Sequence, residues 1–168
     1  DQEDFNNWTP SVSSTSGEVI LGSGNRIVTA ARSRNNIVIL TDKSAHTMQF
    51  IGPPFTFGFN EVGTNCGAAG AHSAVDFDGR VYWMGSANFY VFDGTVKLLP
   101  SLVEDFVFST DGDNLGINYD AASIVYSGSN ALYTEINWFY PKNGSEQIDR
   151  CVTYNYSENV FTTSSLDR

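Results

Sequence analysis

Residues 44–52, SAHTMQFIG, and residues 86–94, SANFYVFDG, share one pattern at a separation of 42 positions. Serine, alanine, phenylalanine and glycine occupy corresponding places in the two stretches. The same offset also aligns Ile39 and Leu40 with Val81 and Tyr82, so the repeat includes the preceding strand. A repeat of about 40 to 50 residues that holds four short strands is typical of a β-propeller blade.

Alternating apolar residues and turn residues divide the chain into three units of this kind. A first blade over 26–63 is expected to hold strands at 26–32, 36–41, 46–51 and 56–62. A second blade over 69–99 is expected to hold strands at 71–77, 81–84, 88–92 and 95–98, with the hairpin signal Asp78-Gly79 after the first of them. A third blade over 121–164 is expected to hold strands at 122–126, 132–140, 147–156 and 159–163.

A short helix is expected near residues 101–107, between the second and third blades. Ser101 can cap such a helix, and the apolar residues at 102, 103, 106 and 107 suit one helical face. Turn residues are abundant elsewhere, so helix is the minority state. The predicted fold class is therefore all-β, a β-propeller-like arrangement of about three four-stranded blades with one short helix.

Three blades are fewer than the roughly four to eight that close a propeller. Three explanations stay open: residues 1–168 are a single β-rich segment of a larger propeller, several copies associate, or the chain folds as a β-sandwich. The first explanation agrees with the start of the chain, DQED at residues 1–4, which has neither Met nor a signal-peptide pattern. We therefore expect a piece of a longer protein.

The chain is strongly acidic, with 19 Asp and Glu against 9 Lys and Arg and a formal net charge of −10. Such a surface repels the phosphate backbone, which argues against tight binding of DNA. It is compatible with a wall past which DNA slides, because repulsion keeps a polyanion from sticking. The sequence contains no apolar run of 18 residues, so no membrane-spanning helix and no membrane partner are expected.

Motifs for catalysis and for cofactor binding are weak, so we expect a protein that is not an enzyme, with no cofactor and no assigned binding site. Asp111, Asp113 and Asp120 are a weak candidate for a calcium site. The calcium-loop template fails at two ligand positions there, and a solvated turn is the preferred interpretation. His46 and His72, the latter with two aspartates close by in sequence, are each interpreted as structural strand residues.

Aromatic side chains are concentrated in the middle strands of the second and third blades. Their faces could form a platform for stacking on sugars, but packed sheets need bulk on both faces, and core packing is the preferred interpretation. The residues concerned are Tyr82, Trp83, Phe89, Tyr90, Phe92, Trp138, Phe139 and Tyr140. The two cysteines, Cys66 and Cys151, are expected to be buried thiols rather than a disulfide.

Several phrases along the chain occur together in one protein family. They are DFNNWTP at 4–10, GPPFTFGF at 52–59, GTNCG at 63–67, VYWMG at 81–85, FDGTVKLLP at 92–100 and IDRCVTYNY at 148–156. In their order and spacing, from residue 4 to about residue 161, the chain resembles the tail hub or nozzle proteins of short-tailed phages, including those called DNA-stabilisation proteins. Members of that family are much longer than this chain.

The resemblance implies a virion structural protein with a β-propeller domain. It implies a homo-oligomeric ring, commonly a hexamer, that contacts the portal or adaptor and other tail proteins. Such a ring retains the genome and conducts it at ejection, so DNA passes without being tightly bound. The implied location is the virion tail, after assembly in the host cytoplasm, and the family supplies no catalytic residues. The alternative expectation is a carbohydrate- or receptor-binding β-propeller or lectin-like module.

Overall fold

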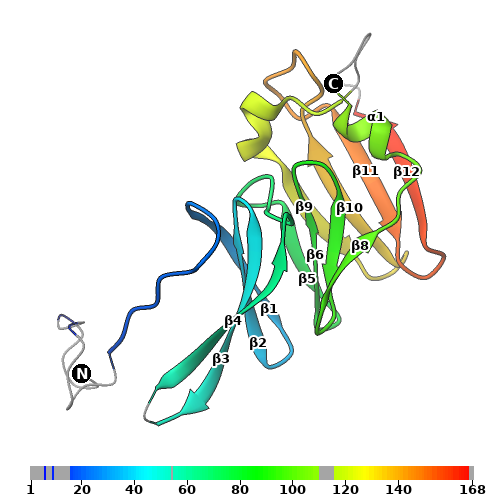
Figure 1. Ribbon diagram of the computed structural model, residues 1–168. Coiled ribbons are helices and arrows are strands. Elements are labelled where there is room, and N and C mark those ends of the chain that lie inside the picture. Colours follow the sequence, from blue (N-terminus) through cyan, green and yellow to red (C-terminus); the bar gives the residue numbers. More distant parts are fainter. Residues whose placement is uncertain (1–5, 7–8, 10–15, 54, 110–115, 167–168) are drawn as a thin grey trace.

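The computed structural model describes residues 6, 9, 16–53, 55–109 and 116–166 (Figure 1). Within these residues, twelve strands form three four-stranded antiparallel sheets. In every sheet the spatial order of the strands is their order in the chain, so each sheet is a simple meander. The prediction of an all-β fold with three four-stranded, blade-like units is confirmed.

The first sheet contains β1 (Ile27–Ser33), β2 (Asn36–Thr41), β3 (Ser44–Gly52) and β4 (Thr56–Thr64). All four strands were expected, with bounds that differ by a few residues. The hairpin of β3 and β4 is longer than the rest of the sheet, because the pairing of β2 with β3 ends at Ile37 and Met48. The remaining part of the hairpin extends beyond β2 as two strands alone.

The second sheet contains β5 (Ala74–Phe77), β6 (Arg80–Met84), β7 (Phe89–Phe92) and β8 (Val96–Leu99). Asp78 and Gly79 join β5 to β6 with φ angles of 49° and 72°. Positive φ at both central residues is the type I′ geometry that matches the twist of a hairpin, so the predicted turn is confirmed. The strand expected from residue 71 begins only at Ala74, because the backbone N–H and the hydroxyl of Ser73 both bond back to the carbonyl of Gly70.

The third sheet contains β9 (Tyr126–Asn130), β10 (Glu135–Tyr140), β11 (Arg150–Asn155) and β12 (Val160–Ser165). The strand expected at 122–126 is wrong. Most of that segment belongs to a 3₁₀ helix, η1 (Tyr119–Ile124). The side chain of Asn118 accepts a hydrogen bond from the N–H of Asp120 at 3.1 Å, and this local cap favours a helical turn over an extended strand.

The predicted short helix is present as α1 (Glu104–Phe108), but its start differs from the expectation. Val103 occupies the N-cap position, and Ser101 instead accepts a hydrogen bond from the N–H of Val103 at 3.2 Å. Val107 and Phe108 are buried and join the core between the second and third sheets. The helix therefore closes one end of the space between these sheets (Figure 1).

The three sheets follow one another as blades do. Their first strands lie side by side, with β5 in contact with both β1 and β9. Ser127 at the start of β9 donates its backbone N–H to the carbonyl of His72 at 2.8 Å, and the hydroxyl of Ser33 in β1 bonds to the carbonyl of Gly79 at 2.7 Å. Three sheets that share a common inner edge differ from the two facing layers of a β-sandwich.

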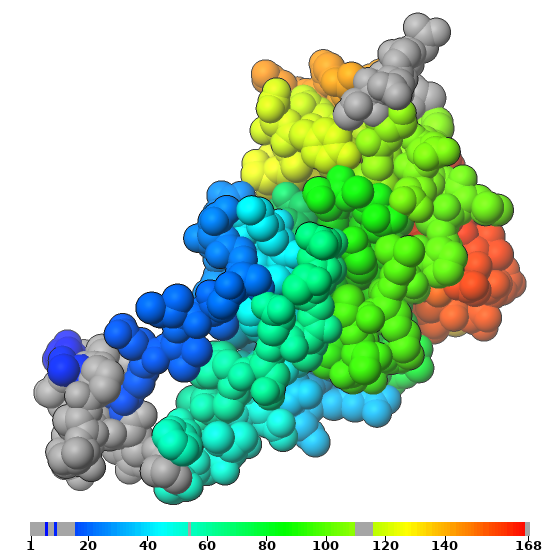
Figure 2. Space-filling model, in the orientation of Figure 1, coloured from blue at the N-terminus to red at the C-terminus, as the bar shows by residue number. Residues whose placement is uncertain are grey.

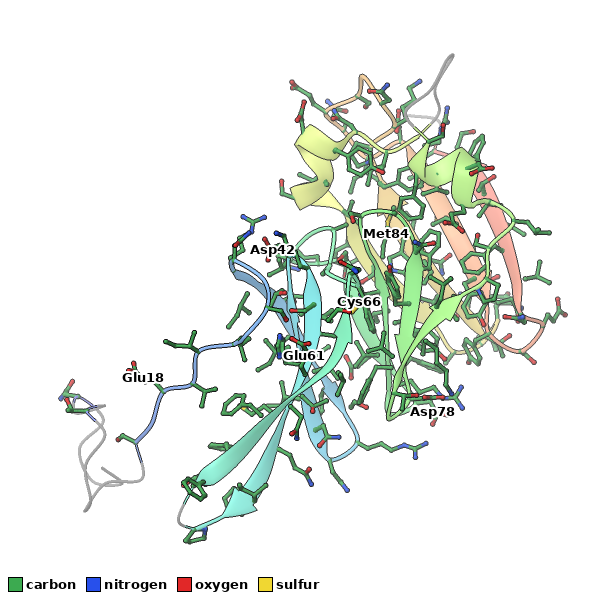
Figure 3. All side chains as sticks on the ribbon, viewed as in Figure 1. Glu18, Asp42, Glu61, Cys66, Asp78 and Met84 are labelled. Atoms are coloured by element: carbon green, nitrogen blue, oxygen red, sulfur yellow. The ribbon has the colours of Figure 1, made fainter. Side chains whose placement is uncertain are left out.

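Two apolar clusters fill the spaces between successive sheets. Side chains alternate along β6, so Val81 and Trp83 join the cluster toward the first sheet, while Tyr82 and Met84 join the cluster toward the third. In Figure 3, Cys66 lies between the first two sheets and Met84 lies toward the third. The second sheet is consequently buried on both faces, and the outer sheets are buried on one face each.

Most of the aromatic side chains singled out in the sequence are core residues. Trp83, Phe89, Phe92, Trp138 and Tyr140 are buried, and Phe89 contacts Trp138 with ring centroids 4.9 Å apart. The indole N–H of Trp138 donates to the carbonyl of Ser73 at 3.0 Å, which ties the second and third sheets together. Core packing of these rings is confirmed.

Both cysteines are free and buried, as expected. Burial raises the pKa of the Cys66 thiol to about 11, and burial also raises the pKa of Cys151. Both thiols are therefore protonated near neutral pH, and they pack as small apolar side chains rather than as nucleophiles.

Candidate functional site

The first sheet has one face that no neighbouring sheet covers, although Ser23 covers the end of this face at His46. We call it the outer face, and it is the side turned away from the second sheet. The strand registers place Arg32, Ile37 and Met48 side by side on this face, and pair Phe50 with Phe57 further along the hairpin. The other side chains of β2, such as Val38 and Leu40, point to the buried face. The outer face is thus an apolar surface with a cation at its inner strand.

A groove of about 620 Å³ follows this outer face. Ile37, Met48 and the edge-to-face pair of Phe50 and Phe57, with ring centroids 5.9 Å apart, form its apolar floor. Arg32 and Arg34 border it at the turn that joins β1 to β2. A groove with an apolar floor and a basic rim suits a protein surface that offers apolar side chains and carboxylates.

The end of the long hairpin adds a second apolar feature. We call residues 49–58 the hairpin arm, and Figures 1 and 2 show it projecting from the body of the molecule. Phe50 is 66% exposed and Phe55 is 76% exposed, although both are large apolar residues. Gly58 has no side chain, and this leaves room for the neighbouring Ile51 to lie against the strand. A two-stranded hairpin with so much apolar surface is typical of an element that is covered by a partner.

The internal repeat identifies the outer face as a surface for packing against another sheet. At the offset of 42 positions, Phe50 corresponds to Phe92 and Met48 to Tyr90. Phe92 is 2% exposed because it lies in the core between the first and second sheets. Phe50 lies on the corresponding face of the first sheet, in the part of β3 beyond the end of β2, and faces solvent. The corresponding face of the sheet is therefore a sheet-to-sheet junction in one blade and an open surface in the other.

The opposite end of the molecule is the outer face of the third sheet, and its chemistry is different. Asn137 lies at the centre of this face, next to Cys151 and Thr153. The Thr153 hydroxyl donates to the Asn137 side-chain oxygen at 2.6 Å. Gly128, paired with Asn137, leaves open space above it, and Tyr126 is 55% exposed. This face is mainly polar, with aromatic side chains near its inner strand.

His46 has partners that the sequence interpretation missed. It is buried, and its Nε2 atom lies 2.9 Å from the Ser44 hydroxyl, 3.4 Å from the Ser23 hydroxyl and 4.0 Å from a Glu61 carboxylate oxygen. Ser44 and His46 are two residues apart on one strand, so their proximity could have been read from the sequence. Ser23 comes from a distant segment and had no sequence signal.

A serine, a histidine and a carboxylate invite comparison with the triad of serine hydrolases. In that triad the serine contacts Nε2 of the histidine and the carboxylate contacts Nδ1. Here the serines and Glu61 all approach the same nitrogen, Nε2. The hydroxyl of Ser44 is buried and bonds to the side chain of Thr41 at 2.7 Å. Ser23 also donates to Glu61, so the network attaches the segment around residue 23 to the first sheet.

The remaining sequence candidates do not form a site in the described part of the chain. Asp120 lies in η1 beside a hollow that Arg26 and Tyr119 also line, while Asp111 and Asp113 lie outside the described residues. His72 precedes β5 and forms an isolated bridge with Tyr126. No group of three or more His, Cys, Asp or Glu residues that could hold a metal ion occurs among the residues that the structure describes.

Comparisons of the chain with protein-family models and with curated proteins find no match. The described helices include none with the length and apolar character needed to cross a lipid bilayer.

Proposed function

We propose that this chain is a structural module of a phage tail, of the hub, nozzle or adaptor type, which assembles into a ring that retains and conducts the genome. The observation that carries the proposal is the uncovered outer face of the first sheet, with Phe50 exposed where its repeat partner Phe92 is buried. A row of blade-like sheets that ends in an exposed apolar surface is expected to pack against further protein at that surface.

The charge of the chain agrees with a conduit for DNA. With a net charge of −10, the protein repels the phosphate backbone, so DNA would pass along it without adhering. In this proposal the partners are further copies in a homo-oligomeric ring, the portal or adaptor, and other tail proteins. The location is the virion tail, reached after assembly in the host cytoplasm.

The titratable cluster around His46 supports a structural rather than an enzymatic role. Its serine hydroxyl is buried and already hydrogen-bonded, and the carboxylate approaches the wrong imidazole nitrogen for a triad. The groove on the outer face has a different composition from a catalytic pocket, because its polar residues are arginines and asparagines at one rim.

Electron cryomicroscopy of the particle from which the sequence derives tests the proposal. We expect density for three adjoining four-stranded sheets in a ring around the tail axis, with the outer face of the first sheet covered by protein. The matched biochemical control is mass spectrometry of purified tails and of DNA-free heads, in which the chain should occur only with tails. Its absence from purified particles would refute the role in the tail.

A further inference from the structure

We propose that the outer face of the first sheet binds the outer face of the third sheet of a second copy of this chain, and that two copies close a six-bladed propeller. The proposal concerns the association of this chain alone. It does not depend on a role in a phage tail, and its failure can be distinguished from failure of the proposed function.

The packing inside one copy shows what such a junction looks like. The first sheet packs against one face of the second, and the opposite face of the second packs against the third. Each junction therefore joins the face that one sheet turns toward the next sheet in the chain with the face that the next sheet turns back toward it. The outer face of the third sheet is the face that would turn toward a following sheet, and the outer face of the first sheet is the face that would turn back toward a preceding one. The third sheet of one copy can therefore meet the first sheet of another in the same manner.

The repeat shows that the outer face of the first sheet has the residues for this role. Ile39, Met48 and Phe50 correspond at the offset of 42 positions to Val81, Tyr90 and Phe92. All three of those residues belong to, or pack on, the core between the first and second sheets. A junction-forming set of side chains is thus present on the first sheet as well, where Phe50 is 66% exposed.

The number of sheets limits how many copies can close. Propellers contain about four to eight blades. One copy supplies three sheets, two copies supply six, and three copies would exceed the range. A head-to-tail contact that closes after two copies contains two identical junctions related by a two-fold axis. Closure by identical chains therefore requires a dimer.

The two outer faces also differ in charge. Arg32 and Arg34 border the groove on the first sheet, whereas the third sheet carries Glu135 beside Asn137. The chain has only 9 basic residues against 19 acidic ones, so the arginines at the rim of the groove are an exception to the general repulsion between copies. Glu61 lies on the same face, beside His46 and away from the groove. Opposite charges on the two faces favour the first-to-third contact over a contact between two first sheets.

Sedimentation velocity and light scattering of the full 168-residue chain test the dimer. We expect a species of twice 18.4 kDa for the wild type. Phe50→Asp on the first sheet and Tyr126→Asp on the third should each give a monomer with an unchanged circular dichroism spectrum. Leu102→Asp is the control, because Leu102 is fully exposed near α1 and lies on neither face. It should remain dimeric.

A mixing experiment distinguishes a head-to-tail contact from a symmetric one. A pair made of Phe50→Asp and Tyr126→Asp keeps one junction with both faces intact, so an equal mixture should recover a heterodimer that neither variant forms alone. A wild type that is monomeric at its highest soluble concentration would overturn the proposal. The proposal would also be overturned if each of the two variants remained a dimer. It would be overturned as well if Phe50→Asp alone abolished the dimer and the mixture of the two variants formed no heterodimer.

Discussion

The first and second sheets are built from the same repeat, yet they have different environments. Phe92 in the second sheet is 2% exposed, and Phe50, its counterpart 42 positions earlier, is 66% exposed. The second sheet lies between two neighbours, whereas the first has a neighbour on one side only. A phenylalanine on the same face of each sheet therefore stabilises the fold only where a second sheet covers it.

The largest expected effect separates these two phenylalanines. Phe92→Ala removes a buried ring and should lower the free energy of unfolding by about 3 to 5 kcal/mol. Phe50→Ala should change it by no more than about 0.5 kcal/mol, because the side chain is mostly in solvent. Urea denaturation of both variants, at protein concentrations low enough to keep the chain monomeric, measures the difference. Equal losses would show that the outer face is covered within a single copy.

A smaller effect is expected at the joint between the two sheets. A side chain at Gly67 would overlap the backbone carbonyl of Asp42, at the turn that connects β2 and β3. The neighbouring N–H groups of Cys66 and Ala68 each bond to backbone carbonyls of this turn region at 3.0 Å. Gly67→Ala should therefore lower the free energy of unfolding by about 1 to 3 kcal/mol, as overpacking does.

Gly22→Ala is the matched control for this joint, since a side chain at Gly22 would have nothing within 4 Å. Thermal unfolding of the two variants should show a clear loss for Gly67→Ala and almost none for Gly22→Ala. If both variants unfold with the midpoint of the wild type, the close approach of the segment after β4 to the first sheet is not a feature of the folded protein.

The smallest effect at neutral pH is expected on the covered face of the third sheet. Tyr140 is buried, and no described residue hydrogen-bonds to its hydroxyl. Tyr140→Phe should therefore leave the free energy of unfolding nearly unchanged at pH 7. Tyr154→Phe is the comparison, because its hydroxyl bonds to the side chain of Asn159 at 2.9 Å, and it should cost about 1 kcal/mol.

Alkaline pH should increase the difference in the free energy of unfolding between the wild type and Tyr140→Phe. Burial raises its pKa to about 12 from an ordinary value of 10.0, so the folded state favours the protonated phenol. The resulting stability is complete below pH 10 and is lost as the pH rises toward 12. Denaturation curves between these limits should fall more steeply for the wild type than for Tyr140→Phe. Identical slopes would place Tyr140 in contact with water.

The sequence predicted most of the fold, because the signals involved are local. Alternation and turn residues identified the strands of the first two sheets, and the Asp78-Gly79 turn has the predicted geometry. The aromatic side chains were correctly assigned to the core. The strand at 122–126 was wrong because a side-chain cap from Asn118 favours a 3₁₀ helix, a preference that alternation does not reveal.

The candidate site was harder to predict because it depends on which face of the first sheet has no neighbouring sheet packed against it. The repeat aligns Phe50 with Phe92, but alignment alone predicts equal burial for both. Their difference arises from the order of the sheets in space. The cluster around His46 was missed for a related reason, since Ser23 reaches it from a segment that shows no alternation.

The hairpin arm has a mechanical consequence. β3 and β4 run from the buried Ser44 to the exposed tip, so tip and core belong to the same two strands. A pull along the strands would load the hydrogen bonds of β2, β3 and β4 in shear, many at once. A pull across them would open the arm one pair at a time. A partner bound to the arm would therefore resist a force along the strands better than a force across them.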